Sequence, residues 1–419
     1  MEIKELYRLY REKYLVDTDT RKIRKGTIFF ALKGENFNGN KFAEEAIKKG
    51  ASYAVIDEEE YATNEKIILV KNVLKTLQNL ANYHRRELGI PIVGLTGSNG
   101  KTTTKEVINA VLSKKYNTTA TLGNLNNHIG VPLTLLSMNP KTEVGIVEMG
   151  ANHHGEIKLL SEISEPSVGY ITNFGKAHLE GFGSVQGVIE AKSELYGFVI
   201  KSNGKVVVNQ EDKIQMEKSK EANQIFFAES VEFISANPFV SLSYKDEIIQ
   251  SNLLGQYNYN NIAAAITIGQ YFNVQLDDIK EAIESYVPKN NRSQVIKRGS
   301  NEIILDAYNA NPTSMKAALE NFDKLSGENK VVILGDMFEL GKDSDVEHQN
   351  IALLSEDLHI TKVMLVGNNF NSVKITSALK FKEFEDVKSY LQNNPMNESK
   401  ILIKGSRGMA LERCLDFIN

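Results

Sequence analysis

A glycine-rich segment at residues 92–104, IVGLTGSNGKTTT, carries the residue types of a phosphate-binding loop. Gly97 and Gly100 allow a tight turn that points backbone N–H groups at an anion, and the helix that follows adds the partial positive charge of its N-terminus. Lys101 is placed to reach the outer phosphates of a nucleotide, and the Thr102 hydroxyl is placed to bind Mg²⁺. The spacing is the short T-G-x-x-G-K-T form, which lacks the first glycine of the full Walker A pattern. The alternative is a glycine turn that caps an ordinary helix.

The flanking sequence predicts the two elements that such a loop needs. An apolar strand over residues 90–95 leads into the turn, and an amphipathic helix follows it. The apolar face of this helix carries Val107, Ile108, Val111 and Leu112. A strand, a glycine turn and a helix in this order favour nucleotide binding over the ordinary helix cap.

Two further strand ends carry side chains that could bind a metal ion. Glu148 follows a predicted strand over residues 144–147, the position of a Walker-B-type acid beside a phosphate-binding loop. His178 lies in a glycine-rich loop after a predicted strand over residues 168–171. A solvated strand end and a surface or packing histidine are the simpler interpretations of each residue alone. The nearby phosphate-binding loop moves the balance to metal binding for Glu148.

Lys192 lies between two glutamates on a helix that begins near Val185, so its spacing predicts an exposed salt-bridge residue. Asn258 and Asn261 precede a helix predicted from Ile262 and could cap it. Their amides could equally meet the edge of a purine, which needs both donors and acceptors.

Three polar strings in the last third of the chain each follow a predicted strand. They are LDAYNANP at residues 305–312, LGDMFELG at 334–341 and LIKGSRGM at 402–409. Each string alone is a plausible turn or helix cap. Ligands in parallel α/β sheets bind beyond the carboxyl ends of the strands, so three such loops in one domain predict the wall of a binding cleft.

Short apolar strands alternate with helical patterns, which predicts an α/β protein with doubly wound parallel sheets. A chain of 419 residues is too long for one core. Breaks at residues 89–91 and 288–292 predict three domains, at residues 1–86, 87–290 and 291–419. The other predicted strands cover residues 27–32, 53–56, 66–70, 205–208, 331–334, 363–366 and 400–403.

Composition excludes several classes of protein. The net charge of −4 leaves no broad basic field for a nucleic acid duplex. No apolar run approaches the roughly 20 residues that span a bilayer, and the N-terminal residues lack the apolar core of a secretion signal. The single cysteine, Cys414, excludes an internal disulfide. We therefore expect a soluble cytoplasmic protein without nucleic acid partners or membrane insertion.

With these strings assembled, the chain resembles the Mur ligase family along essentially its whole length. The matching strings are TGSNGKTTTKE, GNLNNHIGVP, EMGAN, NFGKAHLEGFGS, DAYNANP, GDMFELG and IKGSRGM. Residues 19–42 resemble the uridine-nucleotide-binding region of the family. DAYNANP and GDMFELG resemble the branch that adds D-alanyl-D-alanine to UDP-N-acetylmuramoyl-tripeptide. The resemblance implies a small N-terminal α/β domain that binds UDP, a central P-loop ATPase domain and a Rossmann-like C-terminal ligase domain.

The resemblance also implies roles for individual residues. The residues that would hold ATP are Thr96, Gly97, Ser98, Asn99, Gly100, Lys101, Thr102, Thr103, Asn258, Asn261, Arg292 and Asp306. The residues that would hold the substrate are Thr20, Arg21, Lys33 and Gly34 for UDP, Asn124, Asn126 and Asn127 for the muramoyl peptide, and Asn309, Asn311, Lys404 and Arg407 on the C-terminal side. Two Mg²⁺ ions would bind Thr102, Glu148, His178 and a carbamylated Lys192, whose added group resembles a carboxylate. Lys101, Lys192, His178 and Glu148 would be catalytic.

The implied reaction is ATP-driven peptide-bond formation on a peptidoglycan precursor, through an acyl phosphate, by a cytoplasmic monomer. The sequence departs from the family pattern at Tyr257, where a histidine is common, at Leu305, where an aspartate is common, and at His128, where an acid is frequent.

Other functions remain as alternatives. The diaminopimelate- or lysine-adding members and folylpolyglutamate synthetase form amides by the same chemistry, although DAYNANP argues against both. A P-loop phosphotransferase or regulatory NTPase belongs to a different class. A nucleotide-sugar-binding module without catalysis is a third class, and the intact P-loop lysine and threonine argue against it.

Overall fold

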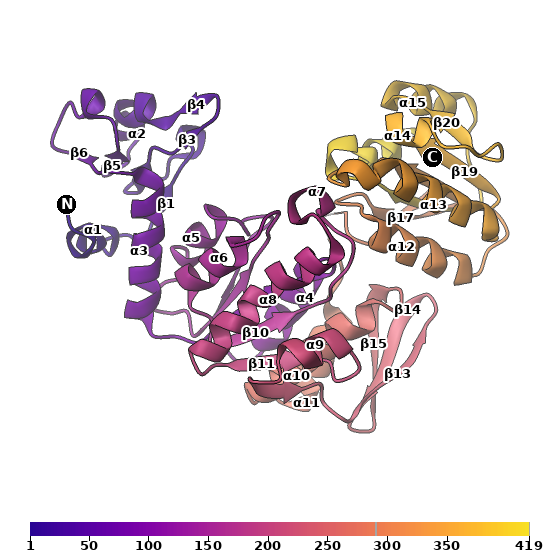
Figure 1. Ribbon diagram of the computed structural model, residues 1–419, viewed down its shortest axis with the longest axis horizontal. Coiled ribbons are helices and arrows are strands. Elements are labelled where there is room, and N and C mark those ends of the chain that lie inside the picture. Colours follow the sequence, from indigo (N-terminus) through magenta and orange to yellow (C-terminus); the bar gives the residue numbers. More distant parts are fainter. Residues whose placement is uncertain (290, 419) are drawn as a thin grey trace.

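The computed structural model describes residues 1–289 and 291–418, which form three α/β domains in chain order (Figure 1). This arrangement confirms the predicted fold class. The predicted domain limits at residues 290 and 419 lie outside the described residues. Within the described part of the chain, no helix is long and apolar enough to cross a membrane.

The N-terminal domain contains a parallel sheet of order β1-β2-β5-β6. Its strands are β1 (Val16–Asp17), β2 (Ile28–Phe30), β5 (Tyr53–Ile56) and β6 (Ile67–Leu69), and β3 (Lys33–Gly34) forms a hairpin with β4 (Phe37–Asn38). The helices are α1 (Ile3–Tyr10), α2 (Ala43–Lys48) and α3 (Val73–Leu88). The Asn72 side chain caps α3 by accepting from the Lys75 amide, and Gly89, at φ 64°, ends the helix.

The central domain contains a parallel sheet of order β12-β11-β10-β7-β9-β8. Its strands are β7 (Ile92–Thr96), β8 (Thr118–Ala120), β9 (Val144–Glu148), β10 (Val168–Ile171), β11 (Lys205–Val208) and β12 (Asn223–Phe226). The helices are α4 (Lys101–Leu112), α5 (Gly130–Leu135), α6 (Glu156–Ser164), α7 (Leu179–Phe182), α8 (Val185–Lys201), α9 (Lys213–Lys218), α10 (Asn258–Tyr271) and α11 (Leu276–Ser285). The chain leaves β7 toward β8 and β9 on one side and reaches β10 on the other. The phosphate-binding loop therefore lies at a switch point of the sheet, where doubly wound folds bind ligands.

An antiparallel sheet of β13 (Val231–Ala236), β14 (Phe239–Tyr244) and β15 (Glu247–Leu254) also belongs to this domain. The sequence pattern predicts none of these strands. Four residues in a row of β13 are exposed, so this strand lacks the alternation or apolar run that identifies a strand in a sequence.

The C-terminal domain contains a sheet of order β16-β17-β21-β18-β19-β20, in which β16 is antiparallel and the other strands are parallel. Its strands are β16 (Gln294–Arg298), β17 (Asn301–Asp306), β18 (Lys330–Gly335), β19 (Lys362–Val366), β20 (Leu379–Phe381) and β21 (Lys400–Lys404). The helices are α12 (Pro312–Lys324), α13 (Ser344–Asp357), α14 (Asn368–Asn371) and α15 (Phe384–Asn393). Every strand predicted for this domain is confirmed.

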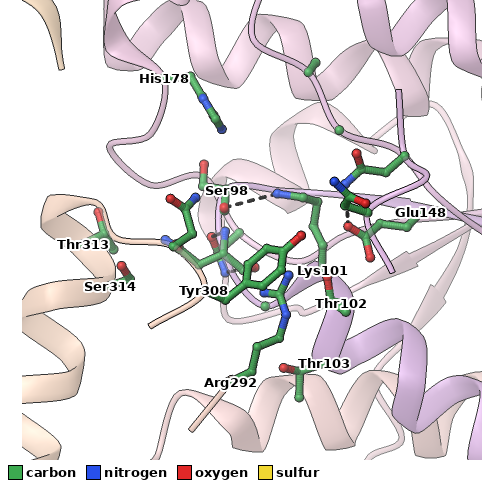
Figure 2. Close-up of a pocket in the computed structure, with 18 of the residues that line it drawn as sticks. Ser98, Lys101, Thr102, Thr103, Glu148, His178, Arg292, Tyr308, Thr313 and Ser314 are labelled. Carbon is green, nitrogen blue, oxygen red and sulfur yellow. Dashed lines mark hydrogen bonds between the residues drawn. The ribbon is translucent and has the colours of Figure 1, made fainter. Parts of the chain in front are cut away.

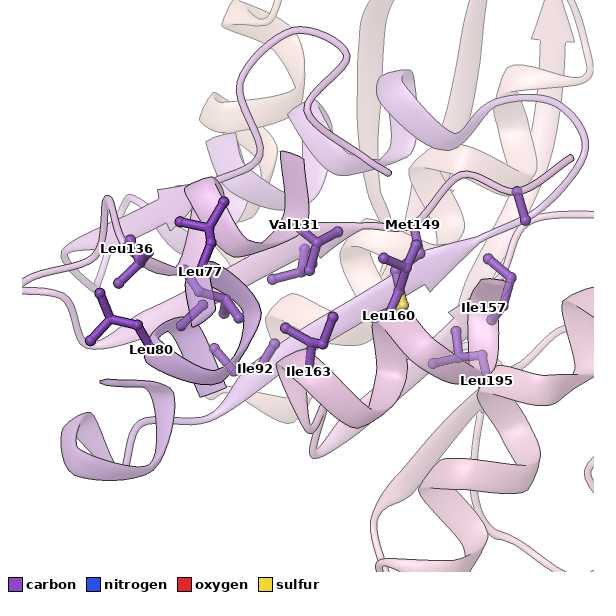
Figure 3. Close-up of a cluster of buried hydrophobic side chains, with 14 of the residues drawn as sticks. Leu77, Leu80, Ile92, Val131, Leu136, Met149, Ile157, Leu160, Ile163 and Leu195 are labelled. Carbon is purple, nitrogen blue, oxygen red and sulfur yellow. The ribbon is translucent and has the colours of Figure 1, made fainter. Parts of the chain in front are cut away.

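One hydrophobic core joins the N-terminal and central domains. Leu77 and Leu80 of α3 lie in the same cluster as Ile92, Val131 and Leu136 of the central domain (Figure 3). Polar contacts reinforce this junction, because the Tyr10 hydroxyl donates to the Leu136 carbonyl at 2.8 Å. The helix α3 therefore holds the first domain on the second.

The substitution Leu77→Ala tests this junction. Leu77 is fully buried, and removing a buried leucine is expected to lower the free energy of unfolding by about 2–5 kcal/mol. Urea unfolding followed by circular dichroism measures the loss. Leu353→Ala is the matched control, because Leu353 is 45% exposed on α13 and its truncation is expected to change stability by about 0.5 kcal/mol or less. Equal losses in the two variants would contradict the shared core.

Candidate active site

A cavity of about 690 Å³ lies between the central and C-terminal domains, at the carboxyl ends of their strands. Most of the predicted site residues line it: Ser98, Asn99, Gly100, Lys101, Thr102, Thr103, Asn124, Asn126, Asn127, Glu148, His178, Asn258, Asn261, Arg292, Asp306, Asn309 and Lys404. The cavity therefore brings together residues from each of the predicted ATP, metal and peptide sets.

The phosphate-binding loop begins where β7 ends, and its glycines are required by close contacts. Gly97 has φ 147° and Gly100 has φ 80°. A Cβ atom on Gly97 would collide with the Thr172 hydroxyl, and one on Gly100 would lie 2.7 Å from Oδ1 of Asn261. Only glycine allows the backbone this close to its neighbours.

The segment that follows β10 holds the loop in place. The Ser98 amide donates to the Asn173 carbonyl at 3.1 Å, and the Asn99 amide donates to Oδ1 of Asn173 at 3.0 Å. The Thr172 hydroxyl donates to the Asn99 carbonyl at 2.5 Å. Thr96 and Gly97 lie directly behind the loop and do not line the cavity, and the Thr96 hydroxyl donates to the Met149 carbonyl.

Lys101 is the first residue of α4, and its ammonium group bends back over the loop. Nζ donates to the carbonyl of Gly97 at 2.7 Å and to that of Ser98 at 3.3 Å (Figure 2). Burial lowers the pKa of Lys101, and the nearby charge of Glu148 acts in the opposite direction. A cation that is desolvated in this way interacts strongly with an anion that enters the cavity.

Glu148 at the end of β9 is 2% exposed, so the solvated-strand-end interpretation is wrong. Its Oε1 accepts from the Asn126 amide at 2.8 Å. Its Oε2 is buried and has no hydrogen-bond partner in the described residues. A buried carboxylate oxygen without a partner is costly, and a bound cation would satisfy it. The residues at this point therefore fit a divalent cation.

His178 directly precedes the short helix α7 and contacts the C-terminal domain. Its Nδ1 lies 2.5 Å from Oε2 of Glu339, in the loop after β18. The His178 side chain holds the pKa of Glu339 below its ordinary value. Within the described residues, no three His, Cys, Asp or Glu side chains gather as metal ligands. A metal shell that includes Glu148 and His178 therefore needs other ligands, and the predicted set supplies the Thr102 hydroxyl and a modified Lys192.

Lys192 is 1% exposed, so the prediction of an exposed salt-bridge residue is wrong. Its Nζ donates to the Ala151 carbonyl at 3.2 Å, although the side chain does not line the cavity itself. Burial lowers the pKa of Lys192 well below its ordinary value, and the charge of Lys101 acts in the same direction. The sequence contains a signal for this burial, because Val188, Ala191 and Leu195 place Lys192 on the apolar face of α8.

Asn258 and Asn261 lie inside the first turn of α10, so the capping interpretation is wrong. The Asn258 amide donates to the Leu254 carbonyl at 2.7 Å, and the Asn261 amide donates to Oδ1 of Asn258 at 2.7 Å. The Thr104 hydroxyl of α4 donates to Oδ1 of Asn261 at 2.9 Å. The pair therefore joins α10 to the helix that carries Lys101.

The C-terminal wall of the cavity is built by the DAYNANP and IKGSRGM loops. Nζ of Lys404 lies 2.6 Å from Oδ2 of Asp306 and donates to the Asn309 carbonyl. Arg407 does not line the cavity, but its guanidinium lies 4.9 Å from the centroid of the Tyr308 ring, which does.

Side-chain contacts close the two domains on each other. The Asn311 amide donates to Oδ1 of Asn99 in the phosphate-binding loop at 2.7 Å, so Asn311 touches the loop without lining the cavity. The Lys176 amide donates to the Thr313 hydroxyl at 3.0 Å. Nζ of Lys176 lies 2.6 Å from Oε1 of Glu347 on α13.

The predicted uridine-binding residues lie apart from this cavity, on the N-terminal domain (Figure 1). Arg21 is exposed and pairs with Asp19 at 2.7 Å. Nζ of Lys33 lies 2.9 Å from Oδ1 of Asp57. Thr20 begins a short 3-10 helix, and Gly34 is exposed on the β3–β4 hairpin.

Several lining residues are absent from the predicted site. They include Asn152, Asn173, Ser293, Tyr308 and Thr313. Asn173 and Tyr308 each follow the end of a strand within two residues, and this position in the sequence is the signal that identifies them.

Comparison with known families gives full-length matches. The model of the Mur ligase family catalytic domain matches residues 13–94, that of the Mur ligase middle domain matches residues 95–269, and that of the Mur ligase glutamate ligase domain matches residues 291–407. The chain is 36% identical to the UDP-N-acetylmuramoyl-tripeptide–D-alanyl-D-alanine ligase of Bacillus subtilis, over 95% of this chain and 91% of that protein.

Solved structures give the same result. A crystal structure of MurF from Acinetobacter baumannii matches with a TM-score of 0.87 at 31% identity, over 96% of this chain and 92% of that one. The MurF ligase of Thermotoga maritima in complex with ADP matches with a TM-score of 0.86 at 26% identity, over 98% and 97% of the two chains.

Charge reversal at Lys176 and Glu347 tests the interdomain contact. Lys176→Glu or Glu347→Lys alone is expected to open the domains, because two like charges then meet. The double variant is expected to close them again. Each reversal is expected to make domain closure less favourable by about 1 kcal/mol, the scale of a partly exposed ion pair. Small-angle X-ray scattering measures the opening as an increase in the radius of gyration.

The control for this test is Lys316→Glu, because Lys316 pairs with Glu320 within the helix α12. A radius that is unchanged in both single reversals would show that the pair does not hold the domains together.

Proposed function

The chain belongs to the Mur ligase family, and we propose that it uses ATP to join D-alanyl-D-alanine to UDP-N-acetylmuramoyl-tripeptide. The products are ADP, phosphate and the UDP-muramoyl-pentapeptide precursor of peptidoglycan. The observation that carries the proposal is the single cavity that brings the phosphate-binding loop of one domain against the DAYNANP and IKGSRGM loops of another. Matches to relatives with this activity over 95% of the chain support it.

The reaction takes place in two steps. The terminal carboxylate of the tripeptide attacks the γ-phosphate of ATP, which gives an acyl phosphate and ADP. The amine of D-alanyl-D-alanine then attacks the acyl carbon, and phosphate leaves. Phosphorylation is needed because a carboxylate is a poor electrophile, whereas phosphate is a competent leaving group.

The residues of the loop stabilise the negative charge in the first step. Lys101 places a desolvated ammonium group at the N-terminus of α4, where the helix adds its partial positive charge. Mg²⁺, held by Thr102, Glu148, His178 and a carbamylated Lys192, would neutralise phosphate charge. The partnerless Oε2 of Glu148 supports a cation at this position.

The environment of Lys192 supports its carbamylation. Burial lowers the pKa of the amine, and the neutral amine is the form that attacks CO₂, with loss of a proton and formation of a carbamate. The resulting anion would lie near the cation Lys101, whereas the unmodified ammonium is repelled by it. The modification therefore replaces a repulsion between two cations with an attraction.

Domain closure protects the acyl phosphate from water. The contacts of Asn311 with Asn99 and of Thr313 with Lys176 join the two domains beside the phosphate-binding loop. A closed site excludes water from a reactive intermediate. We further propose a monomer that acts in the cytoplasm, where ATP is available, without nucleic acid partners.

Phosphate release with different acceptors tests the function. With UDP-N-acetylmuramoyl-tripeptide and ATP, rapid release is expected only when D-alanyl-D-alanine is added, because the acyl phosphate is otherwise retained. Lys101→Ala is expected to abolish release. Equal rates without an acceptor would identify a phosphotransferase or NTPase, and release driven by free amino acids would identify another amide-forming ligase.

Chemical rescue tests the role of Lys192. Lys192→Ala is expected to lower turnover by about 10²–10³-fold, the scale for loss of one electrostatic group from an active site. A short carboxylic acid such as acetate is expected to restore part of the activity, because it replaces the missing carboxylate. Lys201→Ala, on the exposed end of the same helix, is the matched control and is expected to keep full activity. A complete absence of rescue would count against a carbamate at this position.

A further inference from the structure

Tyr308 presents its ring to two arginines at the edge of the cavity. The guanidinium carbon of Arg292 lies 3.7 Å from the ring centroid, and that of Arg407 lies 4.9 Å from it. Both contacts involve the ring and not the hydroxyl. The negative face of an aromatic ring attracts cations, so the ring holds both guanidinium groups near one point.

Pairing of β16 with β17 places Arg292 and Tyr308 together. The antiparallel register sets Gln294 opposite Leu305, and the Ser293 amide donates to Oδ1 of Asp306 at 3.2 Å. Arg292 precedes β16 and Tyr308 follows β17, so both residues lie at the same end of this pairing. Their contact therefore belongs to the fold of the C-terminal domain and moves with that domain.

The stacked arginine faces the phosphate-binding loop of the other domain. Figure 2 shows Arg292 against the Tyr308 ring, beside Lys101. Arg292 and Lys101 both line the cavity. The Nε atom of Arg292 is buried and has no hydrogen-bond partner in the described residues. A guanidinium group with an unused donor, held beside another cation, needs an anion to complete its environment.

We propose that Tyr308 is a positioning residue: its ring holds Arg292 in the orientation that binds the outermost phosphate of a nucleoside triphosphate. Without the ring, a long and flexible arginine side chain would turn toward solvent and away from the neighbouring cation. The aromatic ring is the part of Tyr308 that matters. The proposal rests on the proposed function only for the identity of the anion, a nucleoside triphosphate.

Binding measurements on Tyr308 variants test this proposal directly. Calorimetry gives the affinities of the full chain for ADP and for a non-hydrolysable ATP analogue. Tyr308→Leu removes the ring and keeps apolar bulk, and it is expected to weaken binding of the ATP analogue about tenfold, or ~1.4 kcal/mol, while the affinity for ADP changes less than about twofold. Tyr308→Phe keeps the ring and is the matched control, with expected affinities within about twofold of the unmodified chain.

A double-mutant cycle shows whether Tyr308 acts through Arg292. In the Arg292→Ala background, Tyr308→Leu is expected to cause no further loss of affinity for the ATP analogue, whereas in the Arg407→Ala background the tenfold loss is expected to persist. A residue that only supports the fold would lower the affinity equally in every background. Tyr308→Met replaces Tyr308→Leu if the leucine variant does not fold.

Three results would overturn the proposal: an unchanged affinity in Tyr308→Leu, a loss in Tyr308→Phe as large as in Tyr308→Leu, or an additive loss in the Arg292→Ala background. All three are binding measurements. They are independent of the acceptor, so failure of D-alanyl-D-alanine addition would refute the proposed function and leave the role of Tyr308 to be decided by these affinities.

Discussion

The structure depends on how closely the backbone of the phosphate-binding loop, at the carboxyl end of β7, approaches its neighbours. Gly97 packs against Thr172, and Gly100 packs against the amide of Asn261, each closer than a Cβ atom would allow. The segment after β10 and the helix α10 can reach the phosphate-binding loop only because Gly97 and Gly100 have no side chains. The loop is thereby fixed from two sides before any ligand is present, and a loop fixed in this way loses little conformational entropy when it binds an anion.

Buried charged side chains surround this fixed loop, and the protein alone does not pair all of these charges. Lys404 has Asp306 as its partner, but the Lys192 ammonium contacts the Ala151 carbonyl and the Phe182 ring, and one oxygen of Glu148 has no partner in the described residues. Buried charges are costly unless they are paired. A triphosphate with divalent cations supplies charges of both signs, so the ligands complete an electrostatic arrangement that the fold leaves open.

The sequence predicts the buried parallel strands and the phosphate-binding loop, because both depend on local patterns. The short edge strands β8 and β20 contain no buried residue, so they have no apolar run to detect. Lys192 shows a different failure: its two neighbouring glutamates predict exposure, whereas the apolar residues three and four positions away predict burial and are correct. The contact of Tyr308 with Arg292 could not be predicted, because it depends on the register of two strands and not on spacing along the chain.

The division of the cavity between two domains follows from the chemistry. An acyl phosphate must be protected from water, yet a UDP-linked peptide and a dipeptide must both enter. A rigid single-domain pocket cannot satisfy both needs, whereas two domains joined by a few polar contacts can. The contacts in this structure suit that role: Asn311 with Asn99, His178 with Glu339, and Lys176 with Glu347 are polar pairs that water can replace when the domains open.

The apolar core that joins the first two domains has the opposite character, because exposing it would cost far more. From the difference in chemistry between the two junctions we therefore expect the N-terminal domain to stay attached to the central domain and the C-terminal domain to move.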